Sequence, residues 1–433
     1  LPDPLLCHIL SFLPTKDSVR SSLLSKRWRN IWLQVPVFDL DSVQFDNDVS
    51  SFMEFVDRFL ESDKKLALDR FKLMCSYEDL DDDSVLKSWI DALVRRRVRH
   101  LDFQVNSDDN ELVWMPLSLY SCNTLVSLSL YHVALCGFEL ASAVSLPCLK
   151  VLNLWLQVPV FDLLLASCPV LEMLTVIRDR FELLETMSVR SKSLISFALG
   201  IEDYEVGLLG DDHVVEIDAP RLEHMSLCDH LSGSIIIHSI APSALVKIDV
   251  NFDGKDRYAL LYQDYDDDDD DDDSNSKRTM IRNFLTRIST VCGMEISSVT
   301  LQVIHDYSKW EPLPQFSDLS WLNASFLESF WELLPTFLCC CPNLHTLEFV
   351  FDKEGCPLKL SSVPPCFVSS LKYVELSTRV TTRSSSQMKL ARYFLRNCPA
   401  LKKLTLSGNF GDDIIKKIKK IPRRSRRCII VTG

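Results

Sequence analysis

Glycine is scarce in this sequence, with 11 residues in a chain of 433. No glycine-rich turn that could cradle a phosphate group is visible, and neither a P-loop nor a dinucleotide-binding fingerprint occurs. A G-x-S-x-G nucleophile elbow and an H-E-x-x-H zinc motif are missing as well. The nine histidines are scattered, and none stands in a motif with a nucleophile. The sequence therefore predicts no catalytic residue, no metal site and no cofactor.

Long apolar runs are also missing. No uninterrupted apolar stretch approaches the roughly 20 residues that a membrane-spanning helix needs. We also expect no secretory leader, because the residues from Leu1 onward do not have the pattern of one. The 15 cysteines could form disulfides, but several, such as Cys168, Cys228 and Cys398, lie within apolar stretches. Buried free thiols are therefore expected. We expect an intracellular protein, cytoplasmic or nuclear, that does not bind a membrane.

Positive charge is in deficit, because 47 lysines and arginines face 60 aspartates and glutamates and leave a net charge of −13. An acidic chain repels phosphate groups, so nucleic acid is not an expected partner. Hydrophobic residues make up 47% and charged residues 25%, as in folded soluble proteins. The length exceeds that of one ordinary core and predicts several domains or one repeat array.

The first 35 residues predict three short helices, capped by Asp3, Thr15 and Ser25, with Pro4 at the start of the first and Pro14 at its end. Their apolar side chains form helical stripes: Leu6, Ile9, Leu10 and Leu13, then Val19 and Leu23, then Trp28, Ile31 and Trp32. So small a unit rarely folds without help. Each large apolar side chain left in water forfeits roughly 1.5–3 kcal/mol. Either the rest of the chain or another protein must cover this unit.

These residues resemble the F-box of plant F-box/LRR proteins. The resemblance spans residues 1 to about 40 and rests on the string from Leu1-Pro2-Asp3 through Asp17, and on Leu24 to Arg29 with Trp32. It implies docking on a Skp-type adaptor, which bridges to a cullin and a RING protein. The residues that the resemblance assigns to the adaptor-facing surface or to its support are Leu1, Pro2, Leu5, Leu6, Ile9, Leu10, Leu13, Pro14, Leu24 and Trp28. The open alternative is a helical cap packed on the chain's own body.

A pattern of apolar-x-x-apolar-x-apolar recurs down the rest of the chain. Its copies are Leu68/Phe71/Leu73, Val98/Leu101/Phe103, Leu125/Leu128/Leu130, Leu149/Leu152/Leu154, Leu171/Leu174/Val176, Leu194/Phe197/Leu199, Leu222/Met225/Leu227, Leu245/Ile248/Val250, Ile296/Val299/Leu301, Leu344/Leu347/Phe349, Leu371/Val374/Leu376 and Leu401/Leu404/Leu406. A poorer copy is Leu319/Leu322/Ala324. The first positions lie 22 to 30 residues apart, except for gaps of 51 and 48 residues. These spacings lie in or near the range of leucine-rich repeats.

Stacked copies of this kind form a parallel sheet with a continuous core. Stripes such as Phe52, Phe55, Val56 and Phe59 predict helices between some strands. We therefore expect an α/β protein in which a three-helix F-box precedes a leucine-rich-repeat solenoid, with a parallel β-sheet on the concave face and helices and loops on the convex face. The alternative is a doubly wound α/β domain, which would have fewer strands and longer helices.

Two segments interrupt the repeats. An acidic insertion near 264–276 contains eight consecutive aspartates, Asp266 to Asp273, and predicts a solvated loop. A calcium loop is the alternative, but it lacks the glycine and the glutamate of an EF-hand. A helix is expected from Lys277 to about Cys292. The second segment, Cys339 to Cys341 with His345, could suggest zinc, but its spacing fits no paired-ligand motif, so buried thiols are expected.

The C-terminal stretch from Pro365 to Gly433 resembles the FBD region of plant F-box proteins. The resemblance rests on Asn397 to Leu404, on Ile421-Pro422 and on Cys428 to Val431, among other residues. Eight lysines and arginines are clustered between Lys416 and Arg427. They form either a nuclear-import or anion-binding patch or a solvated helix face with a charged turn.

The sequence and its resemblances together predict the substrate-recognition subunit of a cullin-type ubiquitin ligase, with no catalytic residue of its own. Residues 1–40 would bind the adaptor, residues 41–364 would form the solenoid, and residues 365–433 would form the FBD-like repeats. The target would be a protein of unknown identity. The alternative is a leucine-rich-repeat scaffold that is unconnected with ubiquitin and whose helical head packs on its own solenoid.

Overall fold

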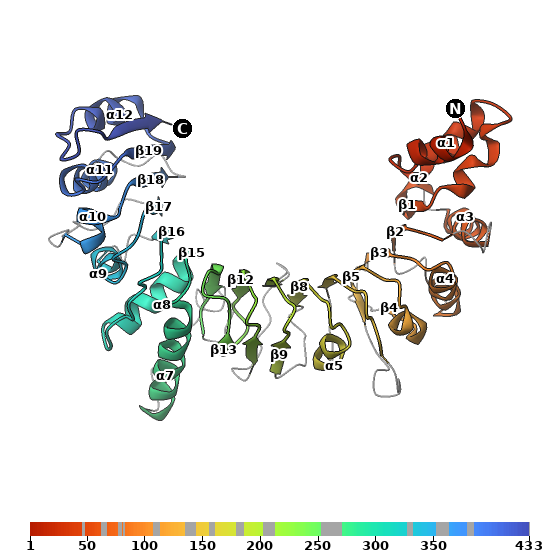
Figure 1. Cartoon of the computed structure of the whole chain (residues 1–433), viewed down its shortest axis with the longest axis horizontal. Helices are drawn as coiled ribbons and strands as arrows, with labels where there is room; N and C mark the ends of the chain where they lie inside the picture. Colours follow the sequence, from red (N-terminus) through yellow and green to blue (C-terminus); the bar gives the residue numbers. More distant parts are fainter. Residues whose placement is uncertain are drawn as a thin grey trace. The chain divides into compact units, whose positions relative to one another are not determined.

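The computed structural model describes residues 1–45, 48–61, 67–76, 80, 83–106, 113–134, 144–155, 161–178, 186–201, 213–252, 271–326, 332–351, 363–378 and 385–432. The chain divides into two compact units, residues 1–203 and 204–433. Each unit combines parallel strands with helices, and the chain order of these elements can be followed in Figure 1.

The first unit begins with short helical elements. They are α1 (Asp3–Leu10), α2 (Thr15–Arg20), and the 3-10 turns η1 (Ser21–Leu23) and η2 (Trp28–Gln34). Because η1 follows α2 without a gap, these elements make up the three helical segments that were predicted, but the predicted caps differ. Helix α1 already includes Asp3, and α2 follows Pro14 without a side-chain cap. The third segment begins at Trp28 as a 3-10 helix, with a backbone bond from its N–H to the carbonyl of Ser25. The N-cap positions of α1 and α2 are occupied by Pro2 and Pro14, whose side chains have no polar atom that could cap a helix.

A parallel sheet follows in the first unit, in the order β1-β2-β3-β5-β7-β8-β10. Its strands are β1 (Val37–Asp41), β2 (Arg70–Ser76), β3 (His100–Asn106), β5 (Ser127–Tyr131), β7 (Val151–Trp155), β8 (Met173–Arg178) and β10 (Ser196–Ile201). The connections hold η3 (Ser42–Phe45), α3 (Val49–Glu61), α4 (Asp83–Arg95), β4 (Val113–Trp114), η5 (Leu117–Ser121), β6 (Val133–Ala134), α5 (Phe161–Ala166) and β9 (Thr186–Arg190). Consecutive strands pair without a change of direction, as stacked repeats require.

The second unit repeats this plan, with a parallel sheet in the order β12-β14-β15-β16-β17-β18-β19-β20. The strands are β12 (His224–Asp229), β14 (Leu245–Val250), β15 (Gly293–Ile296), β16 (Trp321–Phe326), β17 (Thr346–Phe351), β18 (Tyr373–Thr378), β19 (Lys403–Gly408) and β20 (Ile429–Thr432). The other elements are β11 (Val214–Asp218), β13 (Ser234–Ser239), α7 (Asp271–Ile288), α8 (Ser298–Ser308), α9 (Leu333–Cys339), α10 (Pro365–Ser369), α11 (Ser385–Asn397) and α12 (Asp412–Lys419). Strands β11 and β13 pair with each other in parallel.

The repeat pattern holds the core together. The seven predicted copies from Leu68 to Leu227 each coincide with a strand, and all their apolar positions are buried. The copies that begin at Leu344, Leu371 and Leu401, and the poorer copy that begins at Leu319, are confirmed in the same way. Because side chains alternate along a strand, each strand turns two apolar residues inward and leaves the intervening ones on the open face.

Two predicted copies were wrong in register. Leu245 is 42% exposed, and the buried residues of β14 are Val246, Ile248 and Val250. A frame moved by two residues keeps the same strand face inward, so the alternation alone could not reveal this error. The copy Ile296/Val299/Leu301 straddles the end of β15 and helix α8, where Ser297 caps the helix by accepting a hydrogen bond from the Thr300 N–H.

The acidic insertion differs from the prediction at one end. Residues 266–270 of the aspartate run lie outside the described residues. Helix α7 begins at Asp271, six residues before the predicted start at Lys277, and ends at Ile288. Aspartates are favourable at the start of a helix because of the positive end of its dipole. As predicted, Ile281, Phe284, Leu285 and Ile288 face the core.

The cysteines largely follow the prediction. Cys168, Cys340, Cys341 and Cys398 are buried thiols, whereas Cys339 is exposed and Cys228 is half-buried. In the described parts of the chain, no three His, Cys, Asp or Glu side chains are grouped so that they could hold a metal ion. The helices of those parts include none that is both long and apolar enough to cross a membrane.

Candidate functional site

The N-terminal helices have a small core of their own. Leu6 and Leu10, on one side of α1, are 3% and 2% exposed and pack against Ile31 and Val35. Three partly buried side chains surround this cluster: Cys7, Trp28 and Val37. The core is formed by α1, η2 and the chain that leads into β1. It explains how so short a segment keeps its shape.

Polar contacts fix the helices relative to one another. The Ser18 hydroxyl is buried and donates to the carbonyl of Leu10 over 3.1 Å, which links α2 to the end of α1. The Arg27 guanidinium donates through Nε to the Asp3 carboxylate over 3.0 Å and through Nη2 to the carbonyl of Leu1. The Arg27–Asp3 pair is about half exposed, so it adds less than about 1 kcal/mol. Its effect is to hold the first residues beside the turn that precedes η2.

The same helices are joined to the first strand of the sheet. The backbone N–H of Asp39, on β1, donates to the Thr15 hydroxyl over 2.8 Å. Trp32 stacks on Phe55 of α3 with the ring centroids 5.5 Å apart. Phe38 of β1 continues the stack to Phe71 of β2 at 4.8 Å. The inner side of the helical segment is therefore continuous with the core of the repeats.

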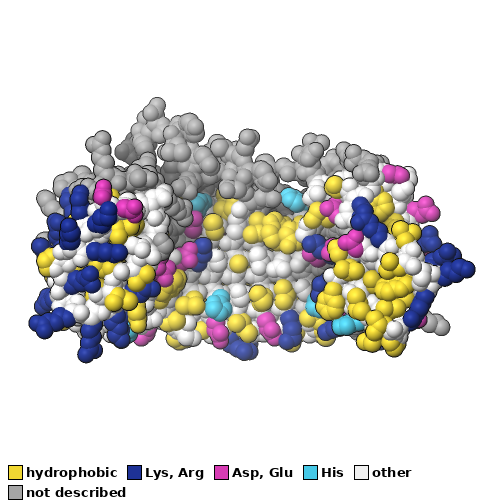
Figure 2. All heavy atoms as spheres, turned by 90° about the horizontal axis from the view of Figure 1, so that it is seen from above, with side chains coloured by type: hydrophobic (Ala, Val, Ile, Leu, Met, Phe, Trp, Pro, Cys, Tyr) yellow, Lys and Arg dark blue, Asp and Glu magenta, His cyan; other side chains and the backbone are white. Residues whose placement is uncertain are grey.

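The outer side of the same segment is apolar and uncovered. Phe12 is 75% exposed, Leu23 86% and Leu24 68%. Other exposed members are Leu1, Leu5, Ile9 and Leu13. Figure 2 shows yellow hydrophobic side chains gathered at the end of the molecule where α1 and α2 lie in Figure 1. We call these seven residues the outer apolar face; so many large apolar side chains on so short a segment mark an interaction site.

The ten residues that the sequence predicted for adaptor binding separate into two sets. Seven are exposed: Leu1, Pro2, Leu5, Ile9, Leu13, Pro14 and Leu24. Leu6 and Leu10 are buried in the small core, and Trp28 is half-buried against it, so these three can only support the face. Phe12 and Leu23 belong to the face but were not predicted. Phe12 lies three residues after Ile9, a helical spacing that could have identified it.

Cations border this face. Lys16, Arg20, Lys26, Arg27 and Arg29 are all exposed. In contrast, the first 30 residues contain only two carboxylates, Asp3 and Asp17, which pair with Arg27 and Arg20. The face therefore combines an apolar centre with a basic rim, the arrangement of a protein interface whose partner is acidic at its edge.

The open face of the first sheet is a second candidate surface. Its middle row runs through Asp39, Lys72, Asp102, Ser129 and Asn153, which are paired strand by strand. Lys72 and Asp102 form an ion pair of 3.6 Å, and Asn153 donates to Ser129 over 3.0 Å.

Beside that row, Tyr131 and Trp155 stack with their ring centroids 4.0 Å apart, and Trp155 is paired with Ile177 on the next strand. Gly200 makes room for Ile177, because a Cβ at Gly200 would come within 2.7 Å of its side chain. The aromatic pair and Ile177 give this surface an apolar region on β5, β7 and β8.

The open face of the second sheet is more acidic. Glu295, Glu348 and Glu375 lie in one row across β15, β17 and β18. Glu295 pairs with Lys247 over 2.9 Å, and Glu348 accepts a hydrogen bond from the indole N–H of Trp321 over 3.0 Å. Like the first sheet, this one presents fixed polar and aromatic side chains on a rigid support.

A group around Asp249 has the residue types of a nucleophilic site, but not the geometry. His230 Nε2 lies 3.1 Å from one carboxylate oxygen, and the Ser297 hydroxyl donates to the same oxygen over 2.5 Å. The Cys228 thiol donates to the other oxygen over 3.8 Å. Burial, followed by the charge of Asp249, raises the pKa of the Cys228 thiol to about 11. A neutral thiol that faces a carboxylate is a poor nucleophile.

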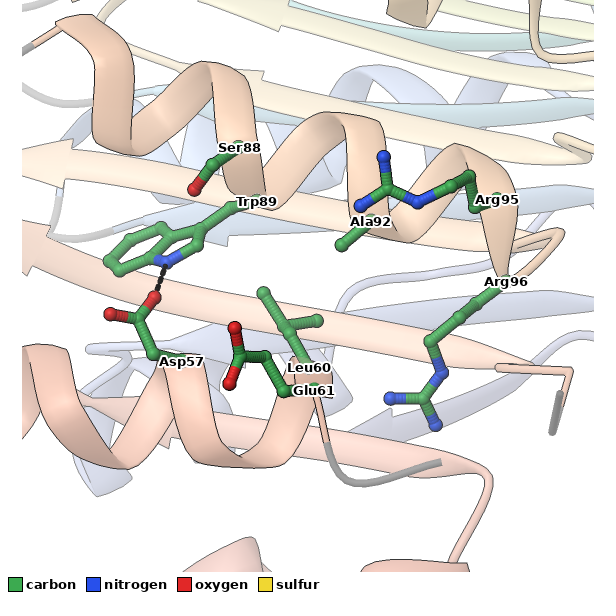
Figure 3. Close-up of a pocket in the computed structure, with 8 residues that line it drawn as sticks. All are labelled: Asp57, Leu60, Glu61, Ser88, Trp89, Ala92, Arg95 and Arg96. Carbon is green, nitrogen blue, oxygen red and sulfur yellow. Dashed lines mark hydrogen bonds between the residues drawn. The ribbon is translucent and has the colours of Figure 1, made fainter. Parts of the chain in front are cut away.

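Helices α3 and α4 enclose a small cavity of about 150 Å³ (Figure 3). Trp89 donates its indole N–H to the Asp57 carboxylate over 2.7 Å across it, and Arg96 donates to the carbonyl of Phe59 over 3.2 Å. A pocket for a small-molecule ligand usually has about 300–1,000 Å³. These polar groups are therefore explained by the packing of two neighbouring repeats.

Comparison with known proteins gives these surfaces a context. The family model for the F-box domain matches residues 1–40, the model described as "FBD-associated F-box protein At5g56370, LRR repeats" matches residues 86–243, and the FBD model matches residues 359–406.

Curated relatives match along nearly the whole chain. The F-box/FBD/LRR-repeat protein At1g80470 of Arabidopsis thaliana is 45% identical over 99% of this chain and 89% of its own length. F-box/LRR-repeat protein 13 of the same plant is 40% identical over 100% of this chain and 95% of its own length. The order of helical segment, repeats and C-terminal region is thus shared from end to end. The chain belongs to the F-box/FBD/LRR-repeat family.

Proposed function

We propose that this chain is the substrate-recognition subunit of a cullin-type ubiquitin ligase. Residues 1–40 dock on a Skp-type adaptor, which carries the chain to a cullin and a RING protein. Residues 41–364 and the FBD-like residues 365–433 hold a target protein. The observation that carries the proposal is the outer apolar face, which the chain's own sheet leaves uncovered.

The energetics of that face support an external partner. Each of its large side chains gains roughly 1.5–3 kcal/mol when a partner buries it. The two sides of α1 have different roles. Leu6 and Leu10 are buried and hold the helix in place, whereas Leu5 and Ile9 are exposed and can contact a partner. The match of the F-box model to residues 1–40 supports the same assignment.

The adaptor-facing set that we propose is the predicted one, extended by the structure. Leu1, Pro2, Leu5, Ile9, Leu13, Pro14 and Leu24 contact the adaptor together with Phe12 and Leu23. Leu6, Leu10 and Trp28 position these residues from beneath. The basic rim steers the approach of an acidic partner.

The mechanism is proximity. Holding a target beside a ubiquitin-conjugating enzyme that carries ubiquitin converts the bimolecular transfer of ubiquitin into an effectively intramolecular one. This chain then needs no acid, base or nucleophile of its own. The open faces of the two sheets, with Tyr131 and Trp155 on one and Trp321 on the other, supply rigid aromatic anchors for a target.

Affinity capture tests the proposal. The full chain, produced together with a plant Skp-type adaptor, is expected to form a stable one-to-one complex. The double variant Leu5→Asp/Ile9→Asp should lose the adaptor, because two charges would then lie in a desolvated interface. The matched control is Leu117→Asp/Val368→Asp, which alters two comparably exposed apolar residues elsewhere and should retain the adaptor. Capture of equal amounts of adaptor by both variants would contradict the proposal.

A leucine-rich-repeat scaffold without a link to ubiquitin is the alternative. In that case the helical head would pack on its own solenoid and leave little for a partner. The exposure of Phe12, Leu23 and Leu24 favours the ligase subunit instead. Production with the adaptor also discriminates here, because a scaffold of this kind gains neither a stoichiometric complex nor solubility from it.

A further inference from the structure

Charge is segregated along this chain. Residues 385–432 contain thirteen lysines and arginines and two aspartates, a formal charge of +11, in a chain whose net charge is −13. The rest of the chain therefore carries −24. Figure 2 shows the excess as dark blue side chains at the end of the molecule where α11 and α12 lie in Figure 1. Charged residues that only keep a surface soluble would not have to be separated into positive and negative regions.

The cations are held on a rigid base. From Lys416 to Cys428, four side chains are buried at intervals of three to four residues: Ile418, Ile421, Ser425 and Cys428. The Ser425 hydroxyl donates to the carbonyl of Leu401 over 2.6 Å. The N–H of Arg424 donates to the carbonyl of Leu395, at the end of α11, over 2.9 Å.

Because this segment is pinned to the repeat beneath it, its cations all face outward. The exposed ones are Lys416, Lys417, Lys419, Lys420, Arg423, Arg424, Arg426 and Arg427. A nuclear-import signal that must be read as an extended peptide would first have to leave this base. The geometry favours a preformed surface instead.

The neighbouring helix adds charge of the same sign. Lys389, Arg392 and Arg396 are exposed on α11, which packs against α12. The only carboxylates between residues 385 and 432 are Asp412 and Asp413, and the ion pair described for them joins Asp413 to Lys416 over 3.7 Å. We call these eleven cations, three on α11 and eight from Lys416 to Arg427, the basic end surface.

The composition of this surface selects its partner. The aromatic side chains of residues 385–432, Tyr393, Phe394 and Phe410, are all buried, so this described segment offers no exposed ring on which unpaired bases could stack. A long nucleic acid would also meet the negative charge of the rest of the chain. A short acidic segment would interact only with the cations near it, because the Debye length is about 8 Å at physiological ionic strength and more distant charges are screened.

We propose that the basic end surface is a docking site for an aspartate- and glutamate-rich segment of a partner protein. The exposed lysines and arginines are spread over α11 and the segment from Lys416 to Arg427, and such a spread of cations selects charge density. The site uses no residue of the N-terminal helices. It therefore goes beyond the proposed ligase function and can be tested without the adaptor.

Fluorescence anisotropy of a labelled twelve-residue glutamate-rich peptide on the full chain tests this proposal. Wild-type protein is expected to bind at low salt and to weaken steeply as salt is added, as charge-driven binding does. The variant Lys417→Glu/Lys420→Glu/Arg426→Glu/Arg427→Glu should bind at least about tenfold more weakly. Circular dichroism confirms that it is folded, and the corresponding four glutamine substitutions should give an intermediate loss.

The matched control reverses four exposed cations elsewhere, Arg58→Glu/Lys87→Glu/Lys192→Glu/Arg221→Glu, and has the same net charge as the test variant. It should bind the peptide within about twofold of wild type, because none of these four residues belongs to the basic end surface. Equal losses in both variants, or no binding by the wild type at low salt, would overturn the proposal. Tighter binding of a twelve-base-pair DNA duplex than of the peptide would also overturn it, in favour of nucleic acid. Leu5→Asp/Ile9→Asp should leave peptide binding unchanged.

Discussion

Helix α1 and the repeat strands treat neighbouring apolar residues differently. Along α1, Leu6 and Leu10 are buried while Leu5 and Ile9 are exposed, so a helix of eight residues presents apolar side chains on two sides. Along a repeat strand such as β19, Leu404 and Leu406 are buried and the polar residue Thr405 separates them, so the apolar side is single. The repeats complete their own core. The N-terminal helices have apolar surface to spare, and this difference is what an interaction site requires.

The largest expected difference in stability is between alanine substitutions of two neighbouring leucines of α1. Leu6→Ala should lower the free energy of unfolding of the N-terminal helices by about 2–5 kcal/mol, because it leaves a cavity in the small core. Leu5→Ala, a change of the same size one residue earlier, should stay within about 0.5 kcal/mol of wild type, as exposed substitutions do. Chemical denaturation monitored by hydrogen exchange of residues 3–20 measures both variants.

The difference between buried and exposed leucines also decides which substitutions are suitable for testing adaptor binding. Leu10→Asp is expected to disrupt the small core, since Leu10 is almost fully buried, and loss of adaptor binding by that variant would not separate unfolding from lost contact. Leu13→Asp changes an exposed side chain and avoids this ambiguity. If Leu5→Ala destabilised the helices as much as Leu6→Ala, the two-sided description of α1 would be wrong.

The register of β14 predicts a smaller effect within the repeats. Val246→Ala should cost roughly 1.5–3 kcal/mol, because Val246 is buried in the sheet core. Leu245→Ala should cost less than about 1 kcal/mol, because Leu245 lies on the open face above Gly293. Denaturant unfolding of the two variants decides between the observed register and the one predicted from the sequence, for which the order of the two losses would be reversed.

The strands could be predicted from the sequence wherever the same requirement for burial recurs from repeat to repeat. The leading apolar residue and the two alternating residues of the copies from Leu68 to Leu227 located seven strands, because each repeat must bury the same face. The pattern was not recognised where one of its residues also belongs to another core. Val35, Phe38 and Leu40 form another copy on β1, but Val35 also belongs to the core of the N-terminal helices, which concealed it.

The candidate site shows the same limit. Helical spacing placed Leu6, Ile9, Leu10 and Leu13 on one stripe, but the neighbours decide which of them are buried. η2 and the residue that follows it cover Leu6 and Leu10 through Ile31 and Val35, and they leave Ile9 and Leu13 exposed. Strands β11 and β13 were not predicted either, because they follow no leucine-rich pattern and arise from the stacking of neighbouring repeats.

Thiol ionisation gives the smallest expected effect and concerns the repeats alone. Burial raises the pKa of Cys168 and of Cys366 to about 12, from an ordinary value of 9.0. The folded state therefore holds these protons more tightly than the unfolded state. The stabilisation is complete below pH 9 and is lost as the pH rises from 9 towards 12. Unfolding free energies at pH 8 and pH 10 should show this decline, and Cys168→Ala/Cys366→Ala should make it less steep, although other thiols with a raised pKa, such as Cys228, remain. An equally steep decline in the variant would contradict the assignment.

Hydroxyl-radical footprinting of the full chain, with and without a Skp-type adaptor, tests most directly whether another polypeptide completes the outer apolar face. Leu5, Phe12, Leu23 and Leu24 should be labelled in the free chain and protected in the complex, while Met173 and Trp310, which are exposed on the repeats, keep their labelling. Equal labelling of the four residues in both samples would contradict the account.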